Sequence, residues 1–383
     1  MDRIDIKDFQ AGKFIQQSGY KSFSPEKINK QWIISDPEIN SLLSEANFKL
    51  GELNSTLKFF EKVDLFAKMF VIKESVSSCR IDGAQIRFDE ILLKENDVKE
   101  DQKGAWREVN NYILSINKAL ENFPKVSISN PLIKEIHKNL IVDLDGKISG
   151  IGEFRKDQNW IGGDIIDSAK FIPPTFSEIN ELMRDLENFI NNDEITVPKL
   201  IKIAIIHYQF ETIHPFLDGN GRIGRTLINL FLVTNGFLLK PILNISDYFE
   251  NTKVLYFENL ANVQIKNDLS KWIKYFLIGI ITSAEKGVTT FQNIQSLQND
   301  VMESRIPTLG GKKLSLAKSV LTYLYKNPTI YSNYLVEAIE ITKPTANAIS
   351  KDFVKRQILV EVTGQKRNRL FIFKDYTKLF DKD

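Results

Sequence analysis

The stretch QFETIHPFLDGNGRIGRTLINL, residues 209–230, places two glycines around an asparagine directly before a periodic apolar run. Glycine weakens helices and strands, so this pair marks a backbone that is bent for a purpose. The apolar spacing that follows predicts a helix from about residue 222. A glycine-rich turn that leads into a helix presents free N–H groups and the positive end of the helix dipole. We therefore expect a phosphate cradle made of Gly219, Asn220 and Gly221.

The polar residues around this cradle suit the transfer of a phosphoryl or nucleotidyl group. Asp218 lies beside it, and a carboxylate in that place is best explained by Mg²⁺ held between it and the phosphates. Arg222 and Arg225 are three residues apart on the predicted helix, so both can reach one face and grip a triphosphate. His214 is then the natural general base for a hydroxyl that attacks phosphorus.

Other interpretations of the same stretch fit less well. A Walker A loop would place lysine and then serine or threonine after the glycines, and this pair is absent. The fragment DGNG is similar to part of a calcium loop, but no glutamate completes the set of ligands. A structural turn with a core histidine and two solvated arginines is the remaining alternative, and it requires six polar positions within twelve residues to coincide.

Composition and charge exclude several classes of protein. The chain has 383 residues, of which 43% are hydrophobic and 26% charged, and this excludes wholesale disorder and fibrous structure. A net charge of +2 demands no nucleic-acid or membrane partner as a global property. Cys79 is the only cysteine, which rules out an intramolecular disulfide and a zinc site built on several thiolates. The polar start of the chain and the short apolar runs predict a cytoplasmic protein without a membrane segment.

Helical periodicity dominates the chain after residue 35. Asp36 and Pro37 are typical of a helix start. The glycine-rich residues 143–164 alternate β-forming side chains and predict a β-hairpin. Residues 1–35 follow no regular pattern and are expected to wrap another part of the protein. Further helices are expected over residues 60–77, 105–123, 130–142, 197–213, 222–236 and, as a pair, 248–286.

The C-terminal part has a different pattern. Pro307 and Gly310 interrupt the helices and indicate a linker. After it the order is helix, helix, helix, strand, turn, strand, with Thr342 capping the third helix, which predicts a winged helix-turn-helix. The predicted division is an N-terminal helical region (1–100), a catalytic core (101–290), a linker (291–312) and a winged-helix domain (313–383).

The stretch HPFLDGNGRIGR, residues 214–225, resembles in full the signature of the Fic family, HxFx(D/E)GNGRxxR. The resemblance covers roughly residues 30–285. It implies a mainly α fold, with a helical core and a β-hairpin flap, here followed by the winged helix-turn-helix. It also implies transfer of AMP from ATP, with Mg²⁺, to a Ser, Thr or Tyr hydroxyl of a protein, including the enzyme itself.

The resemblance implies a role for each position of the motif. His214 would deprotonate the target hydroxyl, Asp218 would hold Mg²⁺, and Arg225 would bind the γ-phosphate. The other implied contacts with the nucleotide are Gly219, Asn220, Gly221, Arg222, Ile223 and Gly224 in the motif, and Tyr256, Phe257 and Gln264 beside the adenine. A Tyr–Phe pair on a helix also fits ordinary core packing. His207 resembles a family position but is expected to be buried support, and His137 has no predicted function.

The segment FRKDQNWIGG resembles the flap of the family. Trp160, Ile161 and Gly162 would belong to it, and such a flap can pair with the target's backbone as an added strand. That arrangement favours a protein substrate. For Trp160 and Ile161, core packing is an equal alternative.

Upstream, SVSSCRIDGAQI resembles the inhibitory motif of the family, (S/T)xxxE(G/N). Ser78 and Gly83 match, but Asp82 stands where the motif has glutamate. In relatives this glutamate pairs with the second motif arginine, here Arg225, and so denies the γ-phosphate its seat. Because aspartate is shorter by one methylene, either the helix lies closer or the inhibition is weaker; we expect a working but weaker brake. A helix end capped by Gly83 is compatible with both.

The winged domain carries a basic face suited to DNA phosphates. Its residues are Lys343, Lys351, Lys355 and Arg356 on the third helix and Lys366, Arg367 and Arg369 at the wing. Protein contacts or a solvated surface are the alternatives. A nucleotide-sensing DNA-binding regulator therefore competes with the adenylyltransferase, as do Fic enzymes that transfer another phosphate-linked group or remove AMP. The intact His214 favours the enzyme. Similar proteins often pair through their N-terminal helices, so a homodimer is also expected.

Overall fold

The computed structural model describes residues 3–60, 63–121, 127–141, 150–364 and 369–381. Over these residues the protein is mainly helical, as predicted, with three small sheets. Its strands are β1 (Arg3–Asp5), β2 (Gly12–Gln16), β3 (Lys21–Pro25), β4 (Gln31–Ile33), β5 (Thr329–Tyr331), β6 (Val360–Glu361) and β7 (Leu370–Ile372). Its helices are α1 (Pro37–Thr56), α2 (Val63–Ile81), α3 (Phe88–Ile91), α4 (Lys103–Glu121), α5 (Asn130–Leu140), α6 (Phe176–Asn191), α7 (Lys199–Ile213), α8 (Asn220–Thr234), α9 (Ile245–Asn251), α10 (Lys253–Lys266), α11 (Leu269–Asp300), α12 (Gly311–Lys326), α13 (Ser332–Ala338), α14 (Lys343–Lys355) and α15 (Lys374–Thr377).

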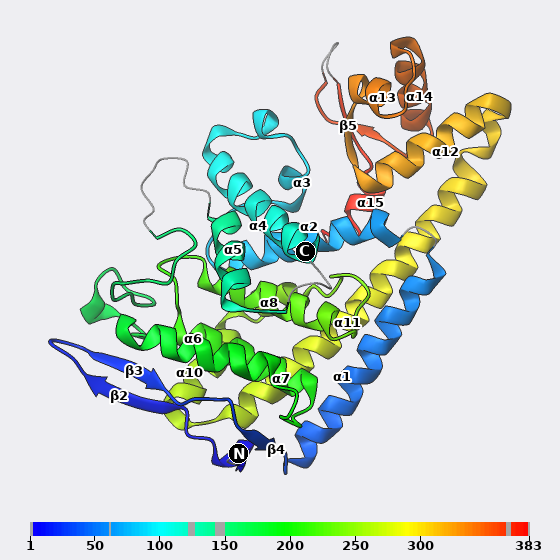
Figure 1. The fold of residues 1–383 in the computed structure, drawn as a ribbon. Coiled ribbons are helices and arrows are strands. Elements are labelled where there is room, and N and C mark those ends of the chain that lie inside the picture. Colours follow the sequence, from blue (N-terminus) through cyan, green and yellow to red (C-terminus); the bar gives the residue numbers. More distant parts are fainter. Residues whose placement is uncertain (1–2, 61–62, 122–126, 142–149, 365–368, 382–383) are drawn as a thin grey trace.

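The N-terminal segment corrects one prediction. Residues 3–33, expected to be irregular, form four short strands: β1 pairs in parallel with β4, and β2 pairs antiparallel with β3. The β2–β3 hairpin projects from the helical body near α6 and α10 (Figure 1). Phe9 and Trp32 anchor the segment, since both are buried and their ring centroids lie 5.3 Å apart. Strands of three to five residues are too short for their alternation to be recognised in the sequence.

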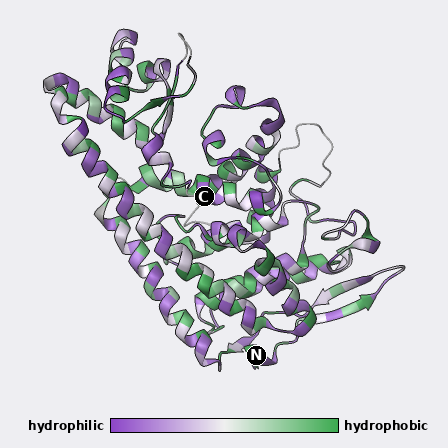
Figure 2. Cartoon of the chain, turned by 180° about the vertical axis from the view of Figure 1, so that it is seen from behind, coloured by the Kyte–Doolittle hydropathy of each residue, from purple (hydrophilic) through white to green (hydrophobic). Residues whose placement is uncertain are grey.

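Two long helices support the body. α1 begins where the sequence predicted, because the Asp36 carboxylate accepts hydrogen bonds from the N–H groups of Glu38 and Ile39. α1 and α11 lie side by side along their lengths (Figure 1). Gly287 permits this close packing, since a Cβ there would lie 2.9 Å from Leu53 Cδ1. Hydrophilic and hydrophobic residues alternate along both helices (Figure 2), as expected for helices with one buried face.

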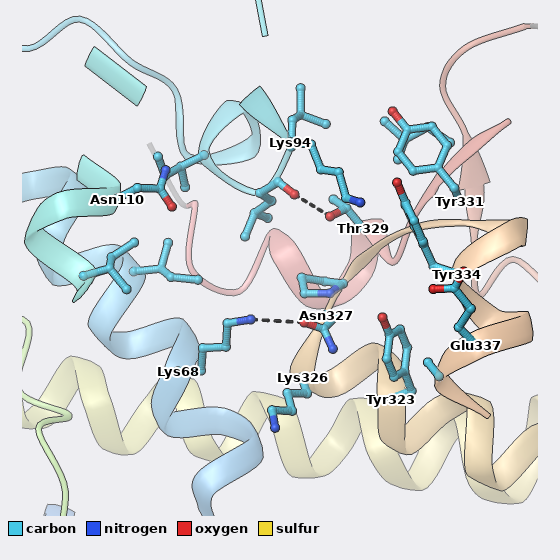
Figure 3. A pocket seen from close by; sticks show the side chains of 18 residues that line it. Lys68, Lys94, Asn110, Tyr323, Lys326, Asn327, Thr329, Tyr331, Tyr334 and Glu337 are labelled. Atoms are coloured by element: carbon cyan, nitrogen blue, oxygen red, sulfur yellow. Dashed lines mark hydrogen bonds between the residues drawn. The ribbon is translucent and has the colours of Figure 1, made fainter. Parts of the chain in front are cut away.

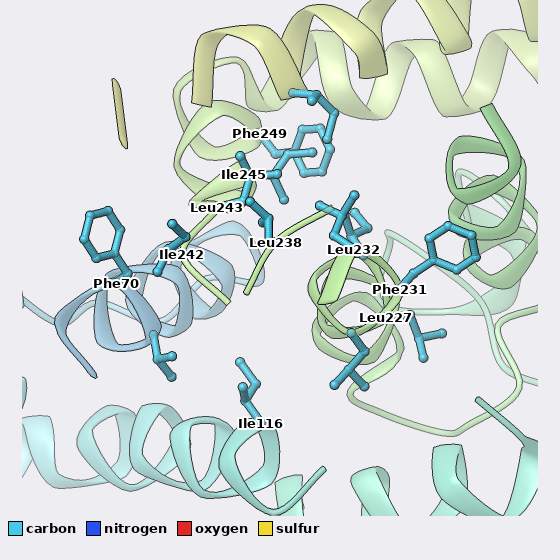
Figure 4. Close-up of a cluster of buried hydrophobic side chains, with 14 of the residues drawn as sticks. Phe70, Ile116, Leu227, Phe231, Leu232, Leu238, Ile242, Leu243, Ile245 and Phe249 are labelled. Atoms are coloured by element: carbon cyan, nitrogen blue, oxygen red, sulfur yellow. The ribbon is translucent and has the colours of Figure 1, made fainter. Parts of the chain in front are cut away.

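Part of the hydrophobic core lies between α2, α4, α8 and α9. Side chains of α2, α4, α8, α9 and the loop after α8 meet there in a cluster of buried residues (Figure 4). Leu227 and Phe231 of α8 belong to it, as the predicted apolar face of that helix requires. The cluster holds α8, and with it the glycine-rich turn, against α2.

The flap differs from the predicted β-hairpin. Residues 143–149 of the predicted hairpin lie outside the described residues, and residues 150–160 contain no strand. Further along, Ile161 and Phe171 form an isolated antiparallel bridge, with the Ile161 N–H donating to the Phe171 carbonyl at 2.8 Å. The Phe23 N–H donates to the Ile172 carbonyl at 2.9 Å, so strand β3 supports this segment. The spacing of the glycines suggested a hairpin. In the structure Gly150, Gly152, Gly162 and Gly163 have positive φ and lie in loops.

The C-terminal part packs near the C-terminal end of α11 (Figure 1). Residues 291–300, placed in the predicted linker, continue α11, and residues 301–305 form a π-helical turn. The predicted order of three helices and two strands is present, with β5 as an additional strand between the first two helices. β7 lies between β5 and β6 and pairs antiparallel with both. The domain boundaries and the winged-helix assignment stay predictions. Of the expected wing residues, Lys366 and Arg367 lie outside the described residues.

Across the described part of the chain, no helix combines the length and apolar character that a membrane span requires.

Candidate active site

A cavity of about 700 Å³ lies between α7, α8, α10, the end of α2 and the flap. It brings together residues that the sequence places more than 180 positions apart. From the predicted site these are Asp82, Trp160, Ile161, Gly162, His214, Asp218, Gly219, Asn220, Gly221, Arg225, Tyr256, Phe257 and Gln264. A volume of this size is typical of small-molecule sites.

His214 ends α7 in a left-handed conformation, with φ 50° and ψ 60°. Such a backbone is uncommon for residues other than glycine and needs support from its surroundings. Arg155 supplies it: its Nε donates to the His214 carbonyl and its backbone N–H to the Pro215 carbonyl, both at 2.9 Å. The same guanidinium also donates to the carbonyls of Asp157 and Pro174. Arg155 thereby joins the flap to the motif.

The imidazole of His214 is oriented as a base. Its Nδ1 lies 3.2 Å from the Glu211 carbonyl oxygen, and because a carbonyl only accepts, Nδ1 carries the proton. Nε2 is therefore the basic nitrogen. Burial lowers the pKa of His214 to about 4, so the ring is neutral near pH 7.

The cradle at the start of α8 is formed by backbone rather than side chains. Gly219 has φ 77°, and a Cβ there would lie 3.1 Å from Ile141 Cδ1. The Asn220 amide braces the loop, since its Oδ1 accepts from the Phe216 N–H at 2.8 Å and its Nδ2 donates to the Phe216 carbonyl at 2.9 Å. The Ile223 N–H donates to the Gly219 carbonyl and begins the helical ladder, so the N–H groups of Asn220, Gly221 and Arg222 are placed for an anion, whereas the Gly219 N–H donates to the Asp218 carboxylate at 2.6 Å.

Arg225 is held by α2. Its Nε donates to the Ser78 hydroxyl at 2.7 Å, and its Nη2 to the Ser78 carbonyl at 3.0 Å. Nη2 also lies 2.9 Å from both carboxylate oxygens of Asp82. Burial alone would lower the pKa of Arg225, but the charge of Asp82 and its other neighbours raise it above the ordinary value.

Gly221 explains how the shorter aspartate reaches the arginine. A Cβ at this position would lie 3.1 Å from Asp82 Oδ1 and 2.8 Å from Arg225 Nη1. The missing side chain lets the end of α2 approach the first turn of α8. Gly83, with φ 111°, turns the chain away directly afterwards. The Asp82 carboxylate thus reaches Arg225 at 2.9 Å despite its shorter side chain, and the strength of the inhibition stays a prediction.

Arg222 points toward a group of carboxylates. It lies 2.8 Å from Glu108, 3.4 Å from Asp218 and 3.5 Å from Asp82. Its guanidinium is thus committed to protein groups.

Two other predicted contacts in the motif face away from the cavity. Ile223 is buried in the core. A Cβ at Gly224 would lie 2.2 Å from Glu211 Oε1, so Gly224 allows α8 to pack on α7.

The predicted adenine residues line one side of the cavity. Tyr256 is buried, and its hydroxyl lies 2.8 Å from Nε2 of His207. That contact makes His207 a buried support, as expected. Phe257 is 45% exposed, and Gln264 donates to the Thr212 hydroxyl at 3.3 Å.

Sequence reasoning missed several functional candidates. Arg155 lies within the quoted flap segment, but nothing in the sequence showed that it would reach His214. Glu211 precedes His214 by one helical turn and lines the cavity, and burial raises the pKa of its carboxyl to about 7. Phe14 and Lys170 also line it, from the β2–β3 hairpin and the flap. His137, given no function, stacks on Phe216 of the motif with ring centroids 4.0 Å apart.

Comparison with known proteins agrees with this geometry. The sequence pattern of the Fic/DOC family matches residues 127–232, and that of the N-terminal region of the family matches residues 40–121. The chain carries a Fic domain. The Fic match ends inside α8 and includes the whole motif from His214 to Arg225.

Relatives and solved structures place the Fic domain in context. A "probable protein adenylyltransferase" of Aquifex aeolicus is 34% identical over 168 residues, which are 43% of this chain and 49% of the relative. The protein adenylyltransferase Fic of Drosophila erecta is 32% identical over 152 residues, 39% of this chain and 28% of that one. The chain thus matches about half of the first relative and less of the second. A Fic family protein of Desulfovibrio desulfuricans has the same fold, with a TM-score of 0.57 at 18% identity, covering 88% of this chain and 96% of that one.

Proposed function

We propose that this protein is a protein adenylyltransferase, which transfers AMP from ATP to a Ser, Thr or Tyr hydroxyl of a protein. The observation that carries the proposal is the single cavity shared by the His214 ring, the glycine cradle and Arg225. The names of the relatives support AMP as the transferred group.

The chain's own groups account for the transfer. The target's hydroxyl oxygen forms a bond to the α-phosphorus of ATP, while the bond from that phosphorus to pyrophosphate breaks. His214 Nε2 takes the hydroxyl proton, and its depressed pKa keeps this nitrogen free at neutral pH. The N–H groups at the start of α8 hold the phosphates.

The residues present fit Mg²⁺ at Asp218. The Asp218 carboxylate lines the cavity and is 64% exposed. No cluster of three or more potential metal ligands occurs among the described His, Cys, Asp and Glu residues. Mg²⁺ bound with ATP needs only one or two carboxylates, because phosphates and water complete its shell. When bound, Mg²⁺ would neutralise phosphate charge.

We also propose that Asp82 inhibits the enzyme. Arg225 cannot clamp a γ-phosphate while Ser78 and Asp82 occupy its donors. Arg225 is 1% exposed, so the engaged guanidinium has little room to turn toward a ligand. Release would require the end of α2 to move.

Replacement of the base tests the proposed function. The chain is incubated with each labelled nucleotide and Mg²⁺, and the mass of the intact protein is measured. Addition of one AMP group is expected with ATP, at a rate that His214→Ala lowers by about 10²–10⁴-fold. The His214→Ala variant should still bind ATP, which serves as the control for folding. Turnover at the unchanged rate would overturn the role of His214, and a different added mass would overturn AMP.

The C-terminal part stays a DNA-binding candidate. Lys343, Lys351 and Lys355 of α14 are exposed, as contact with phosphates requires. Arg369, by contrast, lies 3.7 Å from Glu361. The homodimer and the cytoplasmic location likewise stay predictions.

A further inference from the structure

A second cavity, of about 540 Å³, lies between the catalytic part and the C-terminal part; we call it the junction pocket. One wall comes from α2, α4 and the segment after α3, and the other from α12, β5 and α13 (Figure 3). It shares no lining residue with the Fic cavity. The volume is within the range of sites for nucleotides and molecules of similar size.

Three lysines on three different segments line this pocket: Lys68 on α2, Lys94 after α3 and Lys326 at the end of α12. Among the described residues, no carboxylate forms an ion pair with any of them. Lys68 donates instead to the Asn327 amide oxygen at 3.1 Å. Lys94 lies over the ring of Tyr334, 3.4 Å from its centroid. Both lysines therefore reach across the junction to neutral partners.

Direct ion pairs within the described residues therefore do not neutralise these lysines. Neighbouring protein atoms lower the pKa of the Lys68 ammonium group although its side chain is exposed, and repulsion from Lys326 lowers it further. In the described part of the chain, the three lysines line one pocket without a direct ion pair, although the Glu337 carboxylate lines the same pocket. An anion in the pocket would relieve this repulsion and form charge-assisted hydrogen bonds with the ammonium groups.

Aromatic rings line the wall that α12, β5 and α13 form, to which Lys326 also belongs. Tyr323, Tyr331 and Tyr334 lie along it (Figure 3), and the rings of Tyr331 and Tyr334 meet edge to face at 5.5 Å. Such rings can pack against a planar base, and every base has a face that can stack. Glu337, on the same wall, offers an acceptor for sugar hydroxyls or ring amino groups.

We propose that the junction pocket binds a nucleotide, with its phosphates on Lys68, Lys94 and Lys326 and its base against the tyrosines. Lys68 and Lys94 on one wall, and the tyrosines together with Lys326 on the other, match a ligand that is anionic at one end and planar at the other. Bound there, the nucleotide replaces weak neutral contacts across the junction with contacts to both parts. The site is separate from the proposed adenylyltransferase centre.

Calorimetric titration of the whole chain with ADP tests this site. We expect two ADP molecules per chain, and Lys68→Ala/Lys94→Ala should weaken one of the two by at least about tenfold. The control variant is Lys312→Ala/Lys318→Ala, on the exposed side of α12. It removes the same amount of charge and should leave the affinity of both ADP sites unchanged. If only one ADP binds and the Lys68→Ala/Lys94→Ala variant retains it, the junction pocket is refuted. If only one ADP binds and that variant loses it, the proposal that the Fic cavity binds a nucleotide is refuted instead.

Lysine labelling tests the same site without any substitution. In the unaltered protein, ADP should protect Lys68, Lys94 and Lys326 from acetylation by acetic anhydride, as measured by mass spectrometry of peptides. Lys318 should be labelled equally with and without ADP. Inorganic pyrophosphate should protect at least about tenfold less well than ADP at equal concentration if base stacking contributes to affinity. Equal protection by both would overturn the role assigned to the tyrosines.

Discussion

The two halves of α2 are both buried, but they are held by opposite kinds of contact. Near its start, Phe66 and Phe70 pack among aromatic rings of α11, α12 and the C-terminal segment. Toward its end, most of the buried side chains are polar, namely Lys73, Glu74, Ser75, Ser77 and Ser78, although Val76, Cys79 and Ile81 are buried as well. The first half meets apolar neighbours, and the second meets α9 and Arg225 through ion pairs and hydrogen bonds.

The difference separates anchoring from control. Apolar packing depends on contact area, so it is insensitive to pH and to ligands. Buried polar contacts are directional and costly when broken, so a ligand or a change in protonation can alter them. We infer that the aromatic half fixes α2, whereas the polar half sets whether Asp82 remains on Arg225.

Truncating the aromatic half should give the largest effect. Phe70 is 1% exposed and stacks on Phe291 with centroids 4.7 Å apart. Phe70→Ala should lower the free energy of unfolding by about 3–5 kcal/mol, measured by urea denaturation. Phe48→Ala is the control, since Phe48 is 68% exposed and should change stability by less than about 0.5 kcal/mol. A small loss in Phe70→Ala would show that the aromatic half is not the anchor.

A neighbouring pair of serines isolates the polar half. Ser78 accepts the hydrogen bond from Arg225 Nε, whereas the buried Ser77 hydroxyl has no hydrogen-bond partner in the described structure. Ser78→Ala should therefore cost about 1.5–3 kcal/mol of stability, as expected for a bond to a charged group. Ser77→Ala should be neutral or slightly stabilising. Equal effects in thermal unfolding would mean that the Arg225 contact contributes nothing.

Asp82 should control activity more than stability. Asp82→Gly removes the carboxylate from Arg225, and we expect automodification with ATP to rise about tenfold, which corresponds to about 1.4 kcal/mol. Asp82→Glu should change the rate much less, because aspartate already reaches Arg225 at 2.9 Å. The rate is measured as incorporation of label from ATP into the protein. An unchanged rate in Asp82→Gly would remove the inhibitory assignment.

Local patterns in the sequence predicted much of this arrangement. The helices were predictable because their periodicity is long, and Asp36 and Thr342 cap α1 and α14 as expected. The motif from His214 to Arg225 was predictable because all its residues lie in one short continuous stretch of sequence. Even there, the sequence could not show that Ile223 and Gly224 face away from the cavity.

Contacts between distant segments were beyond prediction. Arg155 reaches His214 across 59 positions, and Phe14 reaches the cavity from a hairpin that no periodic pattern announced. The close approach of Asp82 depends on Gly221, a glycine that the cradle alone seemed to explain. Such contacts are set by the packing of whole helices, which single-chain patterns do not encode.

Glu74 should give the smallest effect and connect the polar half of α2 to pH. Its carboxylate accepts hydrogen bonds from the Ser246 N–H and hydroxyl, but burial raises its pKa to about 7. Because the folded pKa exceeds the unfolded value near 4.5, the stability that protonated Glu74 contributes is lost as pH rises toward and through about 7. Glu74→Gln removes this titration, so its stability relative to the unaltered chain should improve between pH 5 and pH 6, by on the order of 1 kcal/mol. Thermal unfolding at both pH values measures the difference, with Glu45→Gln on the surface of α1 as the matched control. A constant difference would mean that Glu74 keeps one protonation state across this range, and the polar half of α2 would then respond to ligands but not to pH.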